Sequence, residues 1–118
     1  MEKRNEILEL SFEFALDVIR YCDLLEENKK YILARQLLKS GTSIGANIRE
    51  SQNAESTPDF IHKLKIAAKE ADETHYWLLL CKKSENYPNP DNLLKQVESI
   101  KKLLNTIIAI MKRKLSNK

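Results

Sequence analysis

The sequence is poor in the residues that interrupt helices, and this scarcity narrows its fold class. Its 118 residues include 2 glycines and 3 prolines, whereas collagen-like and low-complexity chains are rich in one or both. Hydrophobic residues make up 42% and charged residues 31%, a balance that excludes a disordered chain, which lacks enough apolar side chains to build a core. The length suits one core. We therefore expect a single, mostly helical domain over residues 1–118.

The sequence also lacks the features of exported and membrane-spanning proteins. No run approaches the roughly 18 consecutive apolar residues of a membrane span, and the first ten residues mix acidic with apolar side chains, unlike a signal peptide. We therefore expect the chain to stay in the cytoplasm and away from membranes. Cys22 and Cys81 have no partner at CxxC spacing. In a reducing compartment such lone cysteines are expected to be small core residues, not a disulfide or metal ligands.

Four segments repeat their apolar residues at steps of three and four, which is the spacing of one helix face. At the second break between segments, Thr57 is the expected helix cap and Pro58 the expected first helical residue. Four such helices joined by short turns predict an all-α, up-down-up-down four-helix bundle. The expected helices cover residues 6–27, 31–55, 58–85 and 90–115.

Both glycines lie inside the second of these segments, at Gly41 and Gly45. Each costs about 1 kcal/mol in a helix interior relative to alanine. Because the apolar spacing continues on both sides of them, we expect the helix to run through. We also expect a neighbouring backbone to approach closely there, since that would offset the cost.

The first and last segments carry more apolar surface than one bundle core needs. The first has a second apolar stripe, and the last is apolar over most of its circumference near residues 103–111. Either the core is unusually wide, or the chain forms a homo-oligomer through these two helices, which is the interpretation we favour. The candidate interface residues are Phe12, Leu16, Ile19, Leu103, Ile108 and Ile110.

Several polar residues fall on or near the predicted buried faces of the second and third helices. Buried polar groups need partners, so we expect a buried polar network that fixes the register of these two helices. A ligand site and plain solvent exposure are the alternatives. The residues concerned are Arg35, Lys39, Asn47, Glu50, Glu70 and Glu73.

Charge is uneven along the chain. Residues 1–90 have a net charge of −2 and residues 91–118 a net charge of +5. Basic residues at the end of the last helix interact favourably with its dipole, which is one interpretation. The other is a surface that binds the phosphates of RNA or DNA; no base-reading motif accompanies it. The candidate nucleic-acid-binding residues are Lys101, Lys102, Lys112, Arg113 and Lys114.

The sequence contains none of the catalytic motifs that we considered for a helical or nucleotide-binding enzyme. A di-iron bundle needs a Glu-x-x-His motif on each of two helices, and only Asp72 and His75 have acid-x-x-His spacing. Walker loops and nucleophile elbows are absent. We therefore expect no catalytic residue, no metal, no cofactor and no enzymatic activity. Tyr76 and Trp77 are expected to serve packing or an interface, with base stacking as the alternative.

Two blocks carry a family resemblance. Residues 36–50, with the sequence QLLKSGTSIGANIRE, and residues 59–78 resemble the hallmarks of the four helix bundle protein family, whose founding members are encoded in intervening sequences of bacterial 23S rRNA genes. The resemblance implies a left-handed bundle, a ring assembly expected to be a homopentamer, and no enzymatic activity. It implies family polar positions at Asn47, Glu50, Glu70 and Glu73. Lys39 departs from the arginine expected in many members.

The chain is also similar to the accessory variability determinant of diversity-generating retroelements, a basic pentameric bundle that binds a reverse transcriptase and nucleic acid. We therefore expect a non-enzymatic, oligomeric bundle that binds structured RNA, such as rRNA, or a ribonucleoprotein such as the ribosome. The alternative is a protein–protein adaptor that holds a partner protein on its ring surface.

Overall fold

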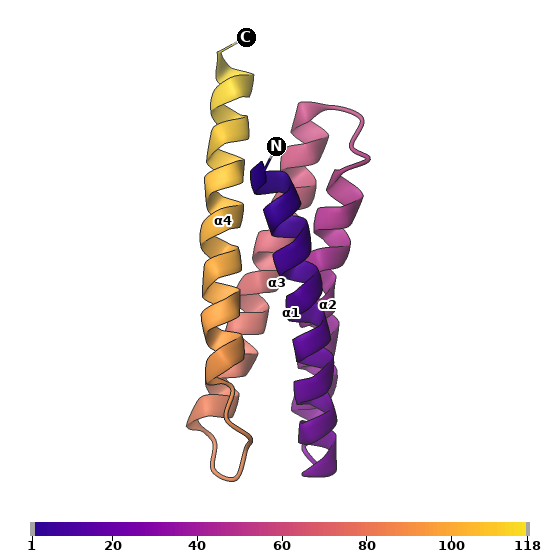
Figure 1. Ribbon diagram of the computed structural model, residues 1–118, viewed down its shortest axis with the longest axis vertical. Coiled ribbons are helices and arrows are strands. Elements are labelled where there is room, and N and C mark those ends of the chain that lie inside the picture. The colour runs from indigo at the N-terminus through magenta and orange to yellow at the C-terminus, as the bar shows by residue number, and fades with distance from the viewer. Residues whose placement is uncertain (1, 118) are drawn as a thin grey trace.

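Four long α-helices make up most of the chain (Figure 1). The structure is a computed structural model that describes residues 2–117, with side chains from residue 6 onward. No strand occurs among these residues, so the all-α prediction is confirmed. The helices are α1 (Glu2–Glu27), α2 (Tyr31–Ser51), α3 (Thr57–Lys83) and α4 (Asp91–Ser116).

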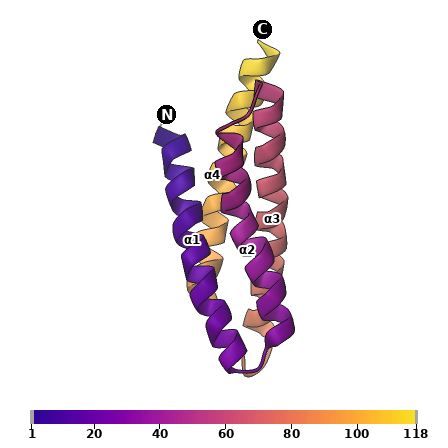
Figure 2. The same ribbon diagram turned by 90° about the vertical axis from the view of Figure 1, so that its right-hand side faces the viewer.

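Consecutive helices run in opposite directions and form a rod (Figures 1 and 2). Its extents are 53 × 22 × 21 Å. Each helix has Cα atoms within 8 Å of the helices before and after it in the sequence, and α1 also approaches α4 in this way. The diagonal pairs, α1 with α3 and α2 with α4, do not come this close. Each helix therefore buries one stripe against two neighbours, as an antiparallel bundle requires. The left-handed sense of the bundle stays a prediction.

The apolar stripes predicted for α1, α3 and α4 form the core. All six residues of the predicted α1 stripe are buried: Ile7, Ser11, Phe14, Val18, Tyr21 and Leu25. The whole predicted α3 stripe is buried as well: Phe60, Leu64, Ala67, Ala71, Thr74, Leu78 and Cys81. On α4 the stripe is buried except for Met111, which packs against the core while partly exposed. Of the six positions predicted for the α2 stripe, Leu37, Ser40, Ile44 and Ser51 are buried as predicted. Leu33 and Asn47 are only half-buried, and their neighbours Ala34 and Ile48 are buried instead.

The end of α2 and the start of α3 differ from the prediction. Helix α2 ends at Ser51, four residues before the predicted boundary at residue 55. Helix α3 begins at Thr57, and the cap is Ser56, whose Oγ accepts the N–H of Asp59 at 3.2 Å. The Asp59 carboxylate in turn accepts the N–H of Glu55 at 3.2 Å. These two hydrogen bonds satisfy the N–H groups of Asp59 and Glu55 around the helix start. Because Ser56 is the cap, the predicted cap at Thr57 is wrong by one residue.

The α1–α2 turn contains no glycine although its geometry favours one. The N–H of Lys30 donates to the carbonyl of Leu25 at 2.7 Å, and that of Lys29 donates to Glu26 at 2.9 Å. This is the bonding pattern of a Schellman motif, with Lys29 in the left-handed region at φ 64°. A residue with a side chain is strained there, so the turn costs energy and other contacts must hold it.

Both glycines instead serve the contact between α1 and α2. A Cβ atom on Gly41 would lie 2.9 and 3.0 Å from the two γ-carbons of Val18, and one on Gly45 would lie 3.4 Å from the carbonyl oxygen of Ser11. The predicted close approach of a backbone is therefore confirmed at Gly45, whereas at Gly41 the close neighbour is a side chain. Side-chain packing of Val18 fills the space that Gly41 leaves empty.

Three ionisable groups lie inside the bundle near the α3–α4 loop. The Tyr21 hydroxyl donates to the carbonyl of Pro88 at 2.6 Å, and the Cys22 thiol donates to the carbonyl of Ala34 at 3.3 Å. Burial raises the pKa of the Cys22 thiol to about 12, and it raises the pKa of Tyr21 and Cys81 as well. A Cys22–Cys81 disulfide would need Cα atoms within about 7 Å, and no Cα pair of α1 and α3 comes within 8 Å.

These buried groups predict that the protein loses stability in alkali. The folded chain keeps the Cys22 proton up to a pH of about 12, whereas the unfolded thiol releases it near its ordinary pKa of 9.0. Stability is therefore unaffected below pH 8 and falls as the pH rises from 9 toward 12. Urea denaturation at a series of pH values measures this decline, which Cys22→Ala should flatten. Tyr31→Phe, at an exposed tyrosine, is the matched control and should leave the decline unchanged.

Candidate nucleic-acid interface

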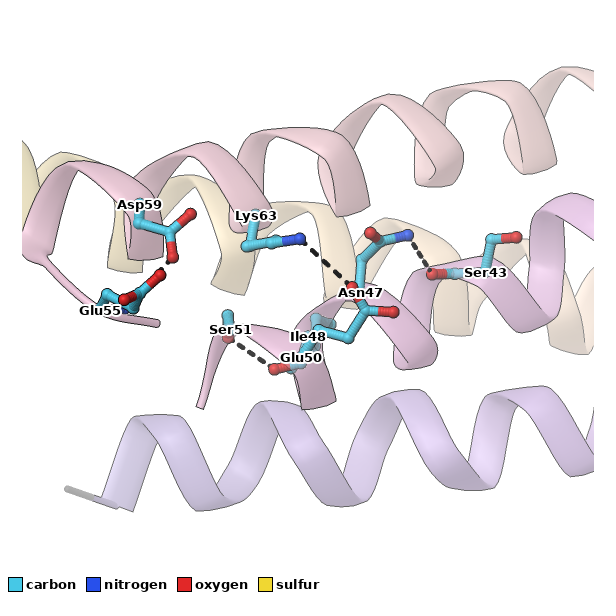
Figure 3. A network of polar contacts seen from close by, with 8 residues as sticks. All are labelled: Ser43, Asn47, Ile48, Glu50, Ser51, Glu55, Asp59 and Lys63. Atoms are coloured by element: carbon cyan, nitrogen blue, oxygen red, sulfur yellow. Dashed lines mark hydrogen bonds and ion pairs between the residues drawn. The ribbon is translucent and has the colours of Figure 1, made fainter. Parts of the chain in front are cut away.

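Polar side chains link α2 and α3 near the start of α3 (Figure 3). The Nζ atom of Lys63 on α3 donates to Oε1 of Glu50 on α2 at 3.3 Å, and Asn47 Nδ2 donates to the carbonyl of Ser43 at 2.8 Å. The Glu50 side chain is 61% exposed. An exposed ion pair of this kind stabilises a fold by about 1 kcal/mol or less, so this cluster only modestly holds α2 to α3.

The predicted buried network is wrong for four of its six members. Arg35, Lys39, Glu50 and Glu73 are exposed, because their long side chains carry the charged groups past the helix surface to water. Asn47 and Glu70 are half-buried. Burial, together with the nearby Glu73 carboxylate, raises the pKa of Glu70, while Lys39 acts in the opposite direction.

The interior polar link between α2 and α3 is a pair of hydroxyls. Thr74 Oγ1 lies 2.9 Å from Ser40 Oγ and 2.7 Å from the carbonyl oxygen of Glu70. Both residues are fully buried, and a buried hydroxyl left without a partner is costly. The pair therefore fixes the register of these helices, the role that the sequence suggested for larger charged residues. Both residues lie on the predicted apolar stripes, and that position was the available signal.

Opposite charges are paired along the seam between α3 and α4. Lys82 Nζ lies 2.5 Å from Asp91 Oδ1, and this contact lowers the pKa of Asp91. Lys101 Nζ lies 3.0 Å from Asp72 Oδ1 and 3.3 Å from His75 Nδ1. The candidate nucleic-acid residue Lys101 is thus already engaged with an acidic group, and its side chain is only 29% exposed.

At the end of the α3–α4 seam near the C-terminus of α4, two lysines lie side by side instead of an oppositely charged pair. Lys65 on α3 is in contact with Lys112 on α4, and this contact lowers the pKa of Lys65. Lys112, Arg113 and Lys114 are all exposed, and α4 continues past the ends of the other helices there (Figures 1 and 2). Sequence reasoning missed Lys65. Only the antiparallel register of α3 and α4 shows that it joins this basic end, which we define as Lys65, Lys112, Arg113 and Lys114.

Lys102 does not join the basic end by any contact in the described structure. It is exposed, one residue beyond the paired Lys101. The five predicted nucleic-acid residues are therefore not one patch. Lys112, Arg113 and Lys114 lie at the end of α4. Lys101 is in an ion pair, and Lys102 is exposed earlier in the same helix.

Most of the apolar surplus predicted for α4 packs into the bundle's own core. Ile108 is buried with 8% exposure, Leu103 packs against the core, and Ile110 is half-buried. Helix α4 packs against both α1 and α3, so its wide apolar face has two partners. The prediction that Ile108 faces a second copy is wrong, and the wide-core interpretation applies to Ile108 and Leu103. An interface role of the half-buried Ile110 stays a prediction.

The apolar surplus on α1 stays at the surface. Phe12 is 57% and Ile19 42% exposed, and Leu16 is half-buried. A shallow cavity of about 220 Å³ lies beside Phe12, between α1 and α2. We call this region the α1–α2 face, formed by Leu8, Phe12, Ala15, Leu16, Ile19, Thr42, Ala46 and the cavity between them.

Neither a metal site nor a membrane-spanning helix occurs among the described residues. In that part of the chain, no three His, Cys, Asp or Glu side chains lie close enough to hold a metal ion. None of the described helices combines the length and apolarity that crossing a bilayer requires.

The fold defines the chain as an all-α protein built as a four-helix bundle. The chain belongs to the 23S rRNA-intervening sequence protein family, which it matches over residues 3–106. It is similar to a crystal structure of a protein with unknown function from the S23 ribosomal protein family of Bacteroides thetaiotaomicron. The two chains are 44% identical and superpose with a TM-score of 0.85, over 91% of this chain and 98% of the other. The comparison with curated proteins found no match. The family resemblance of the sequence is thereby confirmed.

Proposed function

We propose that this protein is a non-enzymatic, oligomeric bundle that binds the phosphate backbone of RNA, rRNA included, through the basic end. The observation that carries the proposal is the cluster of exposed cations at the end of α4, Lys112, Arg113 and Lys114, which Lys65 of α3 joins beside Lys112. Two neighbouring ammonium groups repel each other, and an anion between them removes the repulsion. A phosphate supplies several acceptor oxygens to such a pair.

The surroundings of this pair support the same proposal. Farther along the α3–α4 seam, the acids Asp72 and Asp91 neutralise their lysine neighbours. At the basic end, Arg113 and Lys114 add further exposed cations on the same helix. Phosphates that bind there release condensed counterions, and this release drives binding without base contacts. The family's description as 23S rRNA-intervening sequence protein makes rRNA the first RNA to test.

Self-assembly is the second part of the proposal. The α1–α2 face exposes large apolar side chains in a row on one helix, and such surface is costly to leave in water. A second copy of the chain covers it in the assembly that we propose, a closed ring with five copies as the expected number. Closed symmetry would repeat the basic end once per subunit and so strengthen binding to a long nucleic acid.

A gel-shift titration with 23S rRNA fragments at about 50 and about 200 mM salt tests RNA binding. We expect binding that weakens steeply with salt. The double variant Lys65→Gln/Lys112→Gln should weaken binding to all fragments alike and reduce the log–log salt slope by about two, one for each lost phosphate contact. The matched control is Lys29→Gln/Lys95→Gln, which removes the same charge from two exposed lysines outside the basic end. Absence of binding at the lower salt concentration, or affinity independent of salt, would contradict the proposal.

The α1–α2 face also supports a protein–protein adaptor as a second candidate function. In that case a helix of another protein covers Phe12 and Ile19 in place of a second copy. A pull-down that survives both nuclease treatment and high salt would favour the adaptor, because phosphate-driven association fails under both conditions.

A further inference from the structure

The outward side of α3 carries a regular line of cationic and aromatic residues. Lys69, Tyr76 and Lys83 follow one another at intervals of seven residues, so they lie on the same side of the helix. Successive members are about 10 Å apart along the helix axis. All three side chains are exposed, and Tyr76 is 56% exposed. An aromatic ring therefore stands at the surface with one lysine on either side of it.

The Tyr76 ring is held in place by its neighbour. Its centroid lies 5.3 Å from that of Trp77, and the two ring planes meet at 61°, an edge-on arrangement. The Trp77 indole N–H donates to Oε2 of Glu73 at 3.3 Å, and Trp77 packs against the core. Tyr76 thus has a fixed support on one side, so that stacking another ring on it costs little ordering entropy.

The acidic groups nearest to Tyr76 along α3 are already engaged. The Asp72 carboxylate is paired with Lys101 at 3.0 Å, and the Glu73 carboxylate accepts the indole N–H of Trp77. The Glu73 carboxylate keeps its negative charge in this hydrogen bond because the indole N–H is neutral, so the positive charge of the line comes from Lys69 and Lys83 alone. Beyond Lys69, the line leads along α3 to Lys65 and so to the basic end.

We infer that the line binds single-stranded RNA, with one unpaired base stacked on Tyr76 and the flanking phosphates on Lys69 and Lys83. This inference rests on the proposed function, since it extends the same nucleic-acid surface from the basic end along α3. Bases in a duplex are stacked on each other and offer no free face, whereas an unpaired base can stack on an aromatic side chain. The site should accept any base, because every base has a π-face.

The sole tryptophan of the chain, Trp77, reports this event directly. A base stacked on Tyr76 lies beside the indole and should quench its fluorescence. We would titrate the full-length protein with a twelve-nucleotide oligouridylate and with a twelve-base-pair RNA duplex, following both Trp77 emission and the anisotropy of labelled RNA. We expect quenching with the single strand and none with the duplex.

Variants of Tyr76 separate stacking from charge. Tyr76→Ala should weaken single-strand binding by about fivefold to 150-fold, as the loss of one base–aromatic stack implies, and leave duplex binding unchanged. Tyr76→Phe keeps the ring and should bind like the wild type. Tyr31→Ala removes another exposed tyrosine, 52% exposed at the start of α2, and should change nothing.

The outcomes distinguish this inference from the proposed function. If neither RNA binds, both fail. If both RNAs bind in a salt-dependent way and Tyr76→Ala has no effect on either, the proposed function survives and the single-strand site is refuted. If Tyr76→Ala changes the native mass of the protein, Tyr76 is a contact between copies, and the inference is likewise overturned.

Discussion

Gly41→Val is expected to lower the free energy of unfolding by about 3 kcal/mol, because it forces three extra carbon atoms into a packed contact. A Cβ alone at this position would lie 2.9 Å from one γ-carbon of Val18, and valine adds two more carbons. Val18 is buried and β-branched, so its γ-carbons cannot rotate away easily, and moving α1 away from α2 would open the packed contact between these helices. Urea denaturation followed by circular dichroism measures the change.

Two companion variants test whether the collision with Val18 is the cause. Gly45→Ala places its Cβ 3.4 Å from Ser11, at the edge of ordinary contact, and gains about 1 kcal/mol of helix propensity. It should therefore be neutral or stabilising. Gly41→Ala should be destabilising alone but tolerated with Val18→Ala, which removes both γ-carbons. Equal stability of Gly41→Val and the wild type would show that α1 and α2 separate easily, against the packing described above.

Phe12→Asp is expected to convert the proposed assembly into single chains of 13.7 kDa while the helix content stays unchanged. Phe12 is 57% exposed in the single chain, so its replacement costs the bundle itself little. In the assembly the same side chain would be buried, so the substitution removes its apolar contacts and desolvates a charge, a cost that exceeds what Arg49 on the same cavity returns. Light scattering at micromolar concentration measures the mass of the particle.

The matched control for this experiment is Ile32→Asp. Ile32 is even more exposed, at 76%, but lies at the start of α2, away from the α1–α2 face. Ile32→Asp should leave the mass of the assembly unchanged. This result would show that the assembly depends on the α1–α2 face and not on exposed apolar residues in general. A wild-type particle of 13.7 kDa, or a Phe12→Asp particle as large as the wild type, would refute the assembly.

The helices could be predicted from sequence because their apolar spacing is regular. The α1 stripe from Ile7 to Leu25 and the α3 stripe from Phe60 to Cys81 are buried as predicted. Helix ends were harder, since Ser56 and Thr57 are adjacent and both can cap a helix. Only the observed hydrogen bond of Ser56 with the Asp59 N–H decides between them.

The candidate site could be predicted only in part, for two physical reasons. First, a position near a buried helix face does not say where a long side chain ends, and the charged groups of Arg35 and Lys39 reach water. Second, the contact between Lys65 and Lys112 depends on the register of α3 against α4. Register follows from packing between helices, and apolar spacing within one helix carries no information about it.

The placement of the two glycines has a consequence for how the chain folds. The turn between α1 and α2 is strained at Lys29, so it does not by itself bring the two helices together. The contact of Val18 with Gly41 forms only when both helices are complete and aligned. Neither half of the molecule is then a stable folding unit on its own, because each helix relies on two neighbours for its burial. The bundle should therefore fold in one all-or-none transition, without a populated two-helix intermediate.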